Sequence, residues 1–372
     1  MKKLDYFLLF LVAAIPFIIY MTNPLIVGAD SYFYVNQVCG ITEQSDYTIL
    51  FSTLIHFFEC DFLFFKMFMF VMWFGCLVAM AKIGELYDKE RGVEAAFIMA
   101  GLTLFVLSFF TFENDIVGYF FFFISFFYLI KYDKLGNKFD LILSIIFIIV
   151  SGLFWNGAIY WLAVYPIFWI GFLPIAAYMI FMNLSRFLFF IDANRAIAEH
   201  AMWISVIYWG LTVLFLYGIV KTDRKIVASF LILCIPALFV VKLYVLCIPF
   251  IVLITFNAIR SLRVDKTTVF SSLLMLALMA SAFWGMQSYN NFPTVDDQFV
   301  IEAALEVDLN IQNVFGPGYF IKYLGGSPSS SGSLGENDYV CKGVVIERSF
   351  LEDCNCPIFA EKGTLLAKKC PI

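Results

Sequence analysis

Long apolar runs separated by short polar segments fill the first 288 residues of the chain. The first four runs cover residues 4–21, 62–81, 93–110 and 116–130. A helix needs about 20 predominantly apolar residues to cross the hydrocarbon core of a bilayer. The first run could instead be a signal peptide, but it exceeds the about 7–15 apolar residues usual there, which favours an uncleaved helix. The pattern therefore predicts a series of membrane-spanning helices.

Charged residues between these runs alternate in sign. Lys2 and Lys3 precede the first run, and bases recur at residues 82–91 and 131–138. Acids dominate the other junctions, at residues 30–61 and in the turn 113–115. Cytoplasmic loops carry the excess of Lys and Arg. The acidic loops are therefore expected outside the cell and the basic loops inside.

The middle of the chain requires more crossings. Further apolar runs cover residues 141–154, 158–183, 201–220, 226–241, 243–259 and 268–284. The charges are consistent with this alternation only if residues 158–183 cross twice, which gives about eleven spans with the N-terminus inside and the tail outside. We expect an all-α polytopic domain at residues 1–288 of an integral plasma-membrane protein. Residues 289–372, where polar residues become common, are expected to form a small extracytoplasmic α+β domain.

Composition agrees with this assignment. Hydrophobic residues make up 62% of the chain and charged residues 14%, against about 45–50% apolar residues in soluble domains. Lipid is therefore an expected partner. The net charge of −5 and the lack of a basic tract argue against nucleic acid.

The tail pattern predicts a helix at 297–309, short strands at 311–315, 319–324 and 339–346, and a flexible loop at 327–335. Six cysteines lie in predicted exterior segments: Cys39, Cys60, Cys341, Cys354, Cys356 and Cys370. Their even number on one side favours disulfides. A zinc site is the alternative, although the spacing of Cys354 and Cys356 is unusual for zinc.

Three exterior carboxylates are candidates for chemistry: Asp30, Glu113 and Asp115. Carboxylate oxygens are the ligands that Mg²⁺ and Mn²⁺ prefer, so these side chains could hold a divalent cation. Alternatively, Asp30 is a solvated loop acid, and Asn114 or Asp115 caps the helix that begins at residue 116.

Three exterior basic residues break the charge trend: Arg186, Arg195 and Lys242. A phosphate ligand would explain their position. The alternative is that they snorkel to lipid headgroups.

Several short motifs, in order, resemble those of the GT-C glycosyltransferases, polytopic enzymes that include the oligosaccharyltransferase catalytic subunit and the protein mannosyltransferases. The stretch GADSYFY at residues 28–34 is similar to the first-loop motif of that family, and residues 113–115 are similar to its second acidic motif. Lys242 followed by Pro249 resembles the family's basic residue near a late helix. Residues 313–319 look like the segment that opens the soluble tail.

The resemblance implies a transferase, of inverting hexosyltransferase type, that uses a polyprenyl-phosphate sugar donor. Asp30 would be the catalytic base, Glu113 and Asp115 would hold a divalent cation or order the site, and Lys242, Arg195 and Arg186 would bind the lipid phosphate. The tail lacks the WWDYG motif of oligosaccharyltransferases, which favours transfer of a single sugar to a glycan, lipid or protein. A transporter or flippase and a non-catalytic assembly protein are the alternatives.

Overall fold

A computed structural model describes most of the chain and divides it into two compact units. The described residues are 3–26, 31–42, 51, 53, 60–101, 109–110, 112–165, 209–239, 245–262, 264–289, 293–313, 318–330, 343–348, 354–362 and 365–370. The helical unit comprises Met1–Pro16, Phe70–Phe109 and Asp115–Trp284. The mixed unit comprises Phe17–Met69, Phe110–Asn114 and Gly285–Ile372. The predicted division near residue 288 concerns which residues lie in a membrane, and it stays a prediction.

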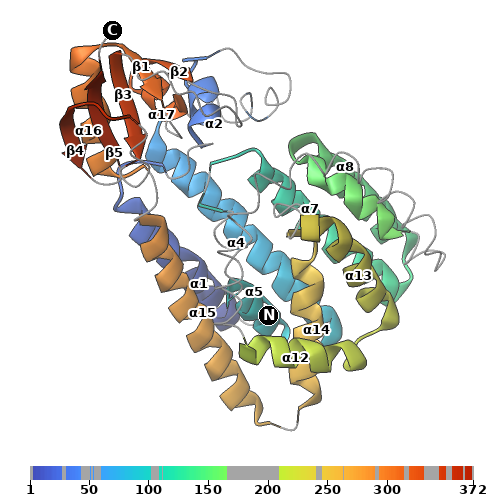
Figure 1. The fold of residues 1–372 in the computed structure, drawn as a ribbon. Coiled ribbons are helices and arrows are strands. Elements are labelled where there is room, and N and C mark those ends of the chain that lie inside the picture. Colours follow the sequence, from blue (N-terminus) through green and yellow to red (C-terminus); the bar gives the residue numbers. More distant parts are fainter. Residues whose placement is uncertain are drawn as a thin grey trace. The chain divides into compact units, whose positions relative to one another are not determined.

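Apolar helices dominate the chain (Figure 1). They are α1 (Lys3–Met21), α4 (Phe62–Tyr87), α5 (Gly92–Gly101), α7 (Asp115–Leu135), α8 (Lys138–Phe154), the 3₁₀ helix η1 (Asn156–Ala163), α12 (Trp209–Lys221), α13 (Arg224–Phe239), α14 (Ile248–Ser261) and α15 (Lys266–Tyr289). Four of the described helices, α1, α4, α7 and α15, are long and apolar enough to cross a membrane. This confirms membrane-capable helices where the hydropathy pattern predicts them. The count of about eleven spans stays a prediction, and residues 166–208 lie outside the described residues.

Buried hydrogen bonds and an ion pair join α7 and α8 in the helical unit. The hydroxyls of Ser125 and Ser144 lie 3.1 Å apart, and the Tyr165 hydroxyl is 2.8 Å from that of Ser144. Near the turn between the helices, Lys131 forms a 2.8 Å ion pair with Asp140. Within an apolar helix pair such contacts satisfy polar groups that lipid cannot solvate.

A five-stranded sheet forms the C-terminal part of the mixed unit. Its strands are β1 (Asn310–Asn313), β2 (Ser327–Ser330), β3 (Gly343–Arg348), β4 (Ile358–Lys362) and β5 (Leu365–Cys370), in the order β2-β1-β3-β5-β4. β1 is parallel to β2 and β3, and the remaining pairs are antiparallel. Helix α16 (Val295–Val307) covers the sheet with its buried residues Val300, Ile301 and Ala304 (Figure 1). The predicted α+β tail is confirmed in this form.

Two tail predictions are wrong. Residues 319–324 form helix α17 (Gly318–Tyr323) rather than a strand. The amides of Gly326 and Gly325 donate to the carbonyls of Ile321 and Lys322, and Gly325 has a φ of 93°, which together form a Schellman helix end. The glycine pair therefore ends a helix. Ser327–Ser330, predicted as loop, forms strand β2 because β1 supplies the backbone partners.

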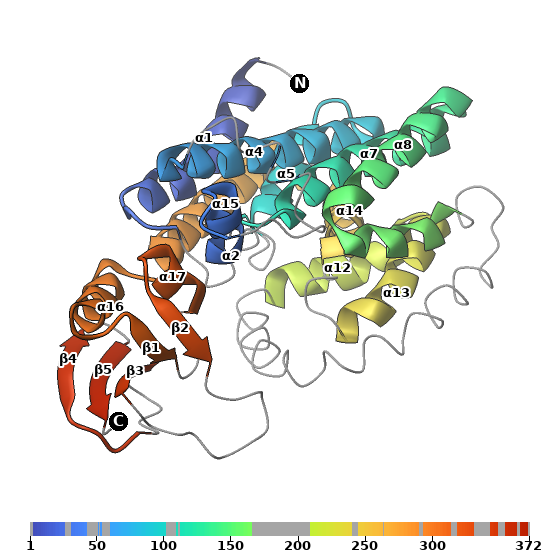
Figure 2. The same ribbon diagram turned by 90° about the horizontal axis from the view of Figure 1, so that it is seen from above.

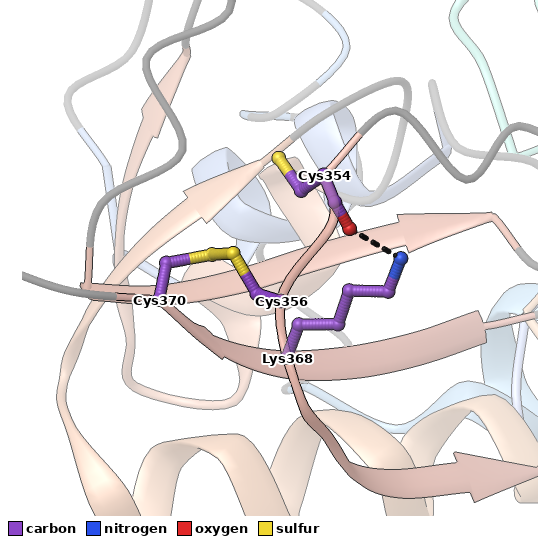
Figure 3. The surroundings of a disulfide bond; sticks show 4 residues. All are labelled: Cys354, Cys356, Lys368 and Cys370. Atoms are coloured by element: carbon purple, nitrogen blue, oxygen red, sulfur yellow. Dashed lines mark hydrogen bonds between the residues drawn. A yellow bond between two sulfur atoms is a disulfide. The ribbon is translucent and has the colours of Figure 1, made fainter.

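Disulfides join cysteines of the segments for which they were predicted. Cys39 is bonded to Cys60, and Cys356 is bonded to Cys370 (Figure 3). Cys354 is also disulfide-bonded, and its carbonyl accepts a 2.7 Å hydrogen bond from the buried ammonium of Lys368. Cys341 lies outside the described residues. These bonds contradict the zinc alternative at Cys356 and Cys370.

Candidate functional site

The described residues on both sides of residues 27–30 are held by hydrogen bonds within the mixed unit. On the N-terminal side, the amide of Leu25 donates to Asn23 Oδ1 at 2.9 Å, and the amide of Ile26 donates to the Tyr32 hydroxyl at 3.4 Å. On the C-terminal side, Ser31 begins helix α2 (Ser31–Val38). These contacts concern the flanking residues alone, because residues 27–30, Asp30 among them, lie outside the described residues.

A buried lysine stabilises the end of α1, just before this segment. Lys66 is 2% exposed, and its ammonium donates to the carbonyls of Tyr20, at 3.4 Å, and Asn23. The ammonium also lies 4.4 Å from the centre of the Tyr20 ring. The last carbonyls of a helix lack intrahelical partners and carry partial negative charge. Lys66 therefore acts as a C-terminal cap of α1 supplied by α4.

Ser31 joins the first loop to the acidic turn. Its hydroxyl oxygen accepts a 2.9 Å hydrogen bond from the amide of Phe112, 81 residues away in the chain. The Phe112 ring is fully buried and lies 4.4 Å from the ring of Phe65 and 5.2 Å from that of Phe51. Ser31 of the motif at residues 28–34 thus meets Phe112, the residue directly before the motif at residues 113–115.

The acidic turn itself is buried. Glu113 is 8% exposed, and Asp115 opens α7. Asn114 is 1% exposed, and neither polar atom of its carboxamide has a hydrogen-bond partner within the described part of the chain. Asn114 directly precedes α7, where an asparagine oxygen usually accepts a bond from the helix. Of the two predicted caps, Asn114 or Asp115, the Asn114 cap is therefore wrong, and the Asp115 cap stays a prediction.

Oxygen ligands for a cation are present but incomplete. Glu113, Asp115 and the unpaired Oδ1 of Asn114 are of the type that Mg²⁺ prefers. Within the described ranges, no group of three or more His, Cys, Asp or Glu side chains is arranged to hold a metal ion. The predicted cation set requires Asp30, which lies outside those ranges, so this set stays a prediction.

The predicted phosphate ligands are not among the residues that the structure describes. Arg186 and Arg195 fall within residues 166–208, and Lys242 falls within residues 240–244. Sequence reasoning, in turn, did not select Lys66 or the carboxamide of Asn114. Lys66 could have been found from the sequence, because it is the only Lys or Arg between Lys3 and Lys82 and lies in an apolar run. Ionisable residues in such runs are expected to be functional.

Helix α17 packs on α2, the helix that begins directly after Asp30 (Figure 2). The Tyr32 ring lies 4.6 Å from the Phe320 ring and 5.4 Å from the Tyr323 ring. The Asn36 carboxamide donates to the carbonyl of Tyr319 at 2.9 Å. Burial raises the pKa of the Tyr32 phenol well above its usual range, so the hydroxyl stays protonated.

A scan against protein-family models finds no match, and a search of curated proteins finds none either.

Proposed function

We propose that the protein is an integral-membrane glycosyltransferase that moves a single sugar from a polyprenyl-phosphate donor to an acceptor hydroxyl. The observation that supports this proposal most is the hydrogen bond between Ser31 and Phe112. It joins the residue after Asp30 to the residue before Glu113, and so it brings together the two acidic motifs that resemble those of GT-C enzymes. An enzyme of this kind needs both motifs at one site.

Asp30 is the proposed general base. It takes the proton of the acceptor hydroxyl while the hydroxyl oxygen forms a bond to the anomeric carbon. The bond between that carbon and the donor phosphate oxygen breaks, and its electron pair leaves with the polyprenyl phosphate. A positioned base contributes about 10²–10⁴-fold to such a rate. A sugar phosphate on a lipid tail reaches this chemistry without leaving the bilayer.

The remaining charged residues are proposed to act on the phosphate. Lys242, Arg195 and Arg186 would neutralise the charge that develops on the leaving group. A divalent cation, if bound, would supply further neutralisation of that charge. Glu113 and Asp115, together with Asp30, are the side chains that would hold it.

The test is Asp30→Asn in the full chain, reconstituted in liposomes with polyprenyl-phosphate hexoses and a panel of glycan, lipid and protein acceptors. We expect kcat to fall by about 10²–10⁴-fold because the amide cannot accept the proton. The matched control is Asp61→Asn, an exposed acid whose Oδ1 accepts a hydrogen bond from the Leu63 amide. The amide side chain keeps that acceptor oxygen, so transfer should be unchanged.

Three results would contradict the proposal. Full transfer by Asp30→Asn would exclude the assigned base. Movement of the intact donor across the liposome membrane, with no sugar transfer to any acceptor, would indicate the flippase alternative. A protein with neither activity would be better explained as an assembly factor.

A further inference from the structure

Two free cysteines of the helical unit lie in contact. Cys234 belongs to α13 and Cys247 directly precedes α14, and their thiols share a hydrogen bond with the two Sγ atoms 3.7 Å apart. Sulfur atoms joined in a disulfide lie about 2.05 Å apart. Each Sγ turns about a single χ1 bond, so the sulfurs need to approach by only the difference between these distances, about 1.7 Å. The contact therefore places a pair of thiols within reach of disulfide formation.

The backbone at Cys247 is fixed, but its thiol is not used by the helix. The Cys247 carbonyl accepts hydrogen bonds from the amides of Phe250, at 3.1 Å, and Ile251, at 3.0 Å. Its side chain makes no capping hydrogen bond to α14. The centre of the Phe250 ring lies 5.1 Å from that of Phe126 and 5.4 Å from that of Trp161, which ties this end of α14 to α7 and η1. The thiol can therefore turn without disturbing the start of the helix.

The two thiols differ in exposure. Cys234 is partly exposed, whereas Cys247 is 1% exposed. An oxidant therefore reaches Cys234 first, and the thiol of Cys247 is left to react with the sulfur beside it. Both cysteines lie in apolar stretches of the chain, so the oxidant that reaches them is expected to be apolar as well.

We propose that Cys234 and Cys247 form a redox modification site, which an apolar disulfide oxidises to a covalent bond between α13 and the start of α14. The Cys234 thiol loses its proton and its sulfur attacks the oxidant, forming a mixed disulfide; the first oxidant thiolate leaves and takes up that proton. The Cys247 sulfur then attacks the Cys234 sulfur and expels the second oxidant thiolate in the same way. The cysteines lose two protons and two electrons, which the oxidant gains as it becomes two thiols.

The new bond would brace α13 in the helical unit. The first turn of α13 is already joined to α7 by the 2.9 Å ion pair between Lys225 and Asp133. A disulfide would add a second link further along the helix, between cysteines 13 positions apart in the chain. Closing such a loop lowers the entropy of the unfolded chain. The oxidised protein is therefore expected to unfold at a temperature about 5 °C higher than the reduced pair allows.

The experiment treats the purified full chain with dithiodipyridine, an apolar disulfide, and then blocks the remaining thiols with N-ethylmaleimide. Trypsin cleaves after Lys225, Lys242 and Arg260, so Cys234 and Cys247 fall on different peptides. Mass spectrometry without reduction should find these two peptides linked in most molecules. The linked pair should be at least about 10-fold less abundant when the oxidant is left out.

Single substitutions test the order of the two steps. In Cys247→Ser, Cys234 should be trapped as the mixed disulfide with the oxidant, and in Cys234→Ser, Cys247 should stay mostly unmodified because it is buried. Neither variant should gain the rise in unfolding temperature. Cys76→Ser is the matched control, since it removes a buried free thiol of α4, and it should keep both the linkage and the rise. Retention of the Cys39–Cys60 disulfide shows that each variant folds.

The possible failures are distinct. Peptides of Cys234 and Cys247 that stay unlinked in oxidised wild type would exclude the modification site. Oxidant bound to Cys247 in Cys234→Ser as readily as to Cys234 in Cys247→Ser would exclude the assigned order. Linked peptides with an unchanged unfolding temperature would exclude the bracing of α13. None of these results depends on sugar transfer, so the inference stands or falls apart from the proposed function.

Discussion

Asn114 carries a stability cost that no contact within the described residues offsets. Its carboxamide is buried, and neither polar atom is hydrogen-bonded there. Such a group costs about 1–3 kcal/mol by mutational measurements. Residues that lower stability in this way are concentrated at functional sites, and Asn114 lies between the two acids of the candidate site. Its burial therefore supports a role in that site.

Replacing Asn114 by leucine tests this cost. Leucine has the same branched shape without polar atoms, so Asn114→Leu should raise the free energy of unfolding by about 1–3 kcal/mol. Under the proposed function it should also lower sugar transfer. The measurement is the thermal unfolding midpoint of the detergent-solubilised protein, beside the transfer assay.

The matched control, Asn137→Leu, is expected to change stability in the opposite direction. Asn137 caps α8, where its Oδ1 accepts from the Phe139 amide at 3.1 Å. Asn137→Leu should therefore lower stability by about 1 kcal/mol. A lower unfolding midpoint for Asn114→Leu would show that its carboxamide is hydrogen-bonded in the folded protein.

Among the elements, α17 is one of the two tail elements that the sequence pattern misassigned; the other is β2. The apolar residues Phe320 and Ile321 of α17 are adjacent, a spacing equally compatible with a buried strand. The glycine pair after the helix decides the conformation, because Gly325 adopts a φ of 93° that other residues adopt at a cost. A helix here presents Phe320 and Tyr323 to Tyr32, and residues 320 and 323 share a face only in a helix.

The role of Gly325 in ending α17 can be tested by substitution. A Cβ on Gly325 would meet no atom within 4 Å, so Gly325→Ala introduces backbone strain alone. We expect the C-terminal domain to lose about 1–2 kcal/mol of stability, measured as increased protease sensitivity and a lower unfolding midpoint. Gly152→Ala is the control, since that glycine lies within α8 and is equally unobstructed. It should be neutral or stabilising, and equal losses in both variants would contradict the strain at Gly325.

On the scale of the whole molecule, the mixed unit contains three of the segments that were predicted to lie outside the cell. It contains the first acidic loop, Glu113 and the C-terminal sheet. It also contains the Cys39–Cys60 and Cys356–Cys370 disulfides, whereas Cys76, Cys234 and Cys247 are free thiols. Disulfides persist in oxidising compartments. The oxidation pattern therefore supports an extracytoplasmic position for the mixed unit.

Thiol labelling tests this topology. After mild reduction of intact cells, a membrane-impermeant maleimide should label Cys39 and Cys356 from outside. Lys134→Cys, at the end of α7 where bases predict the cytoplasm, should be labelled only after permeabilisation. Labelling of Lys134→Cys in intact cells, or protection of Cys356, would contradict the predicted orientation. Mass spectrometry of labelled peptides gives the measurement.

The sequence alone predicted helices α1, α4, α7 and α15, the α16 helix and the oxidised cysteines. These features depend on local quantities: a run of apolar side chains long enough for a bilayer, or the redox state of a compartment. It also identified Glu113 and Asp115 as candidates by residue type. It did not identify Asn114 or Lys66 as residues of the candidate site, because burial and missing hydrogen-bond partners are properties of the folded chain.

Only the tertiary structure decided which of these segments meet. The Ser31–Phe112 bond spans 81 residues and the Asn36–Tyr319 bond spans 283, and no pattern of apolar spacing specifies partners at such separations. Chain packing selects them, because most buried polar groups bond to whichever partner the fold places beside them. The sequence therefore determined the kind of protein and its candidate acids. The structure determined that Ser31 meets Phe112 and that Tyr32 and Asn36 meet the C-terminal helix α17.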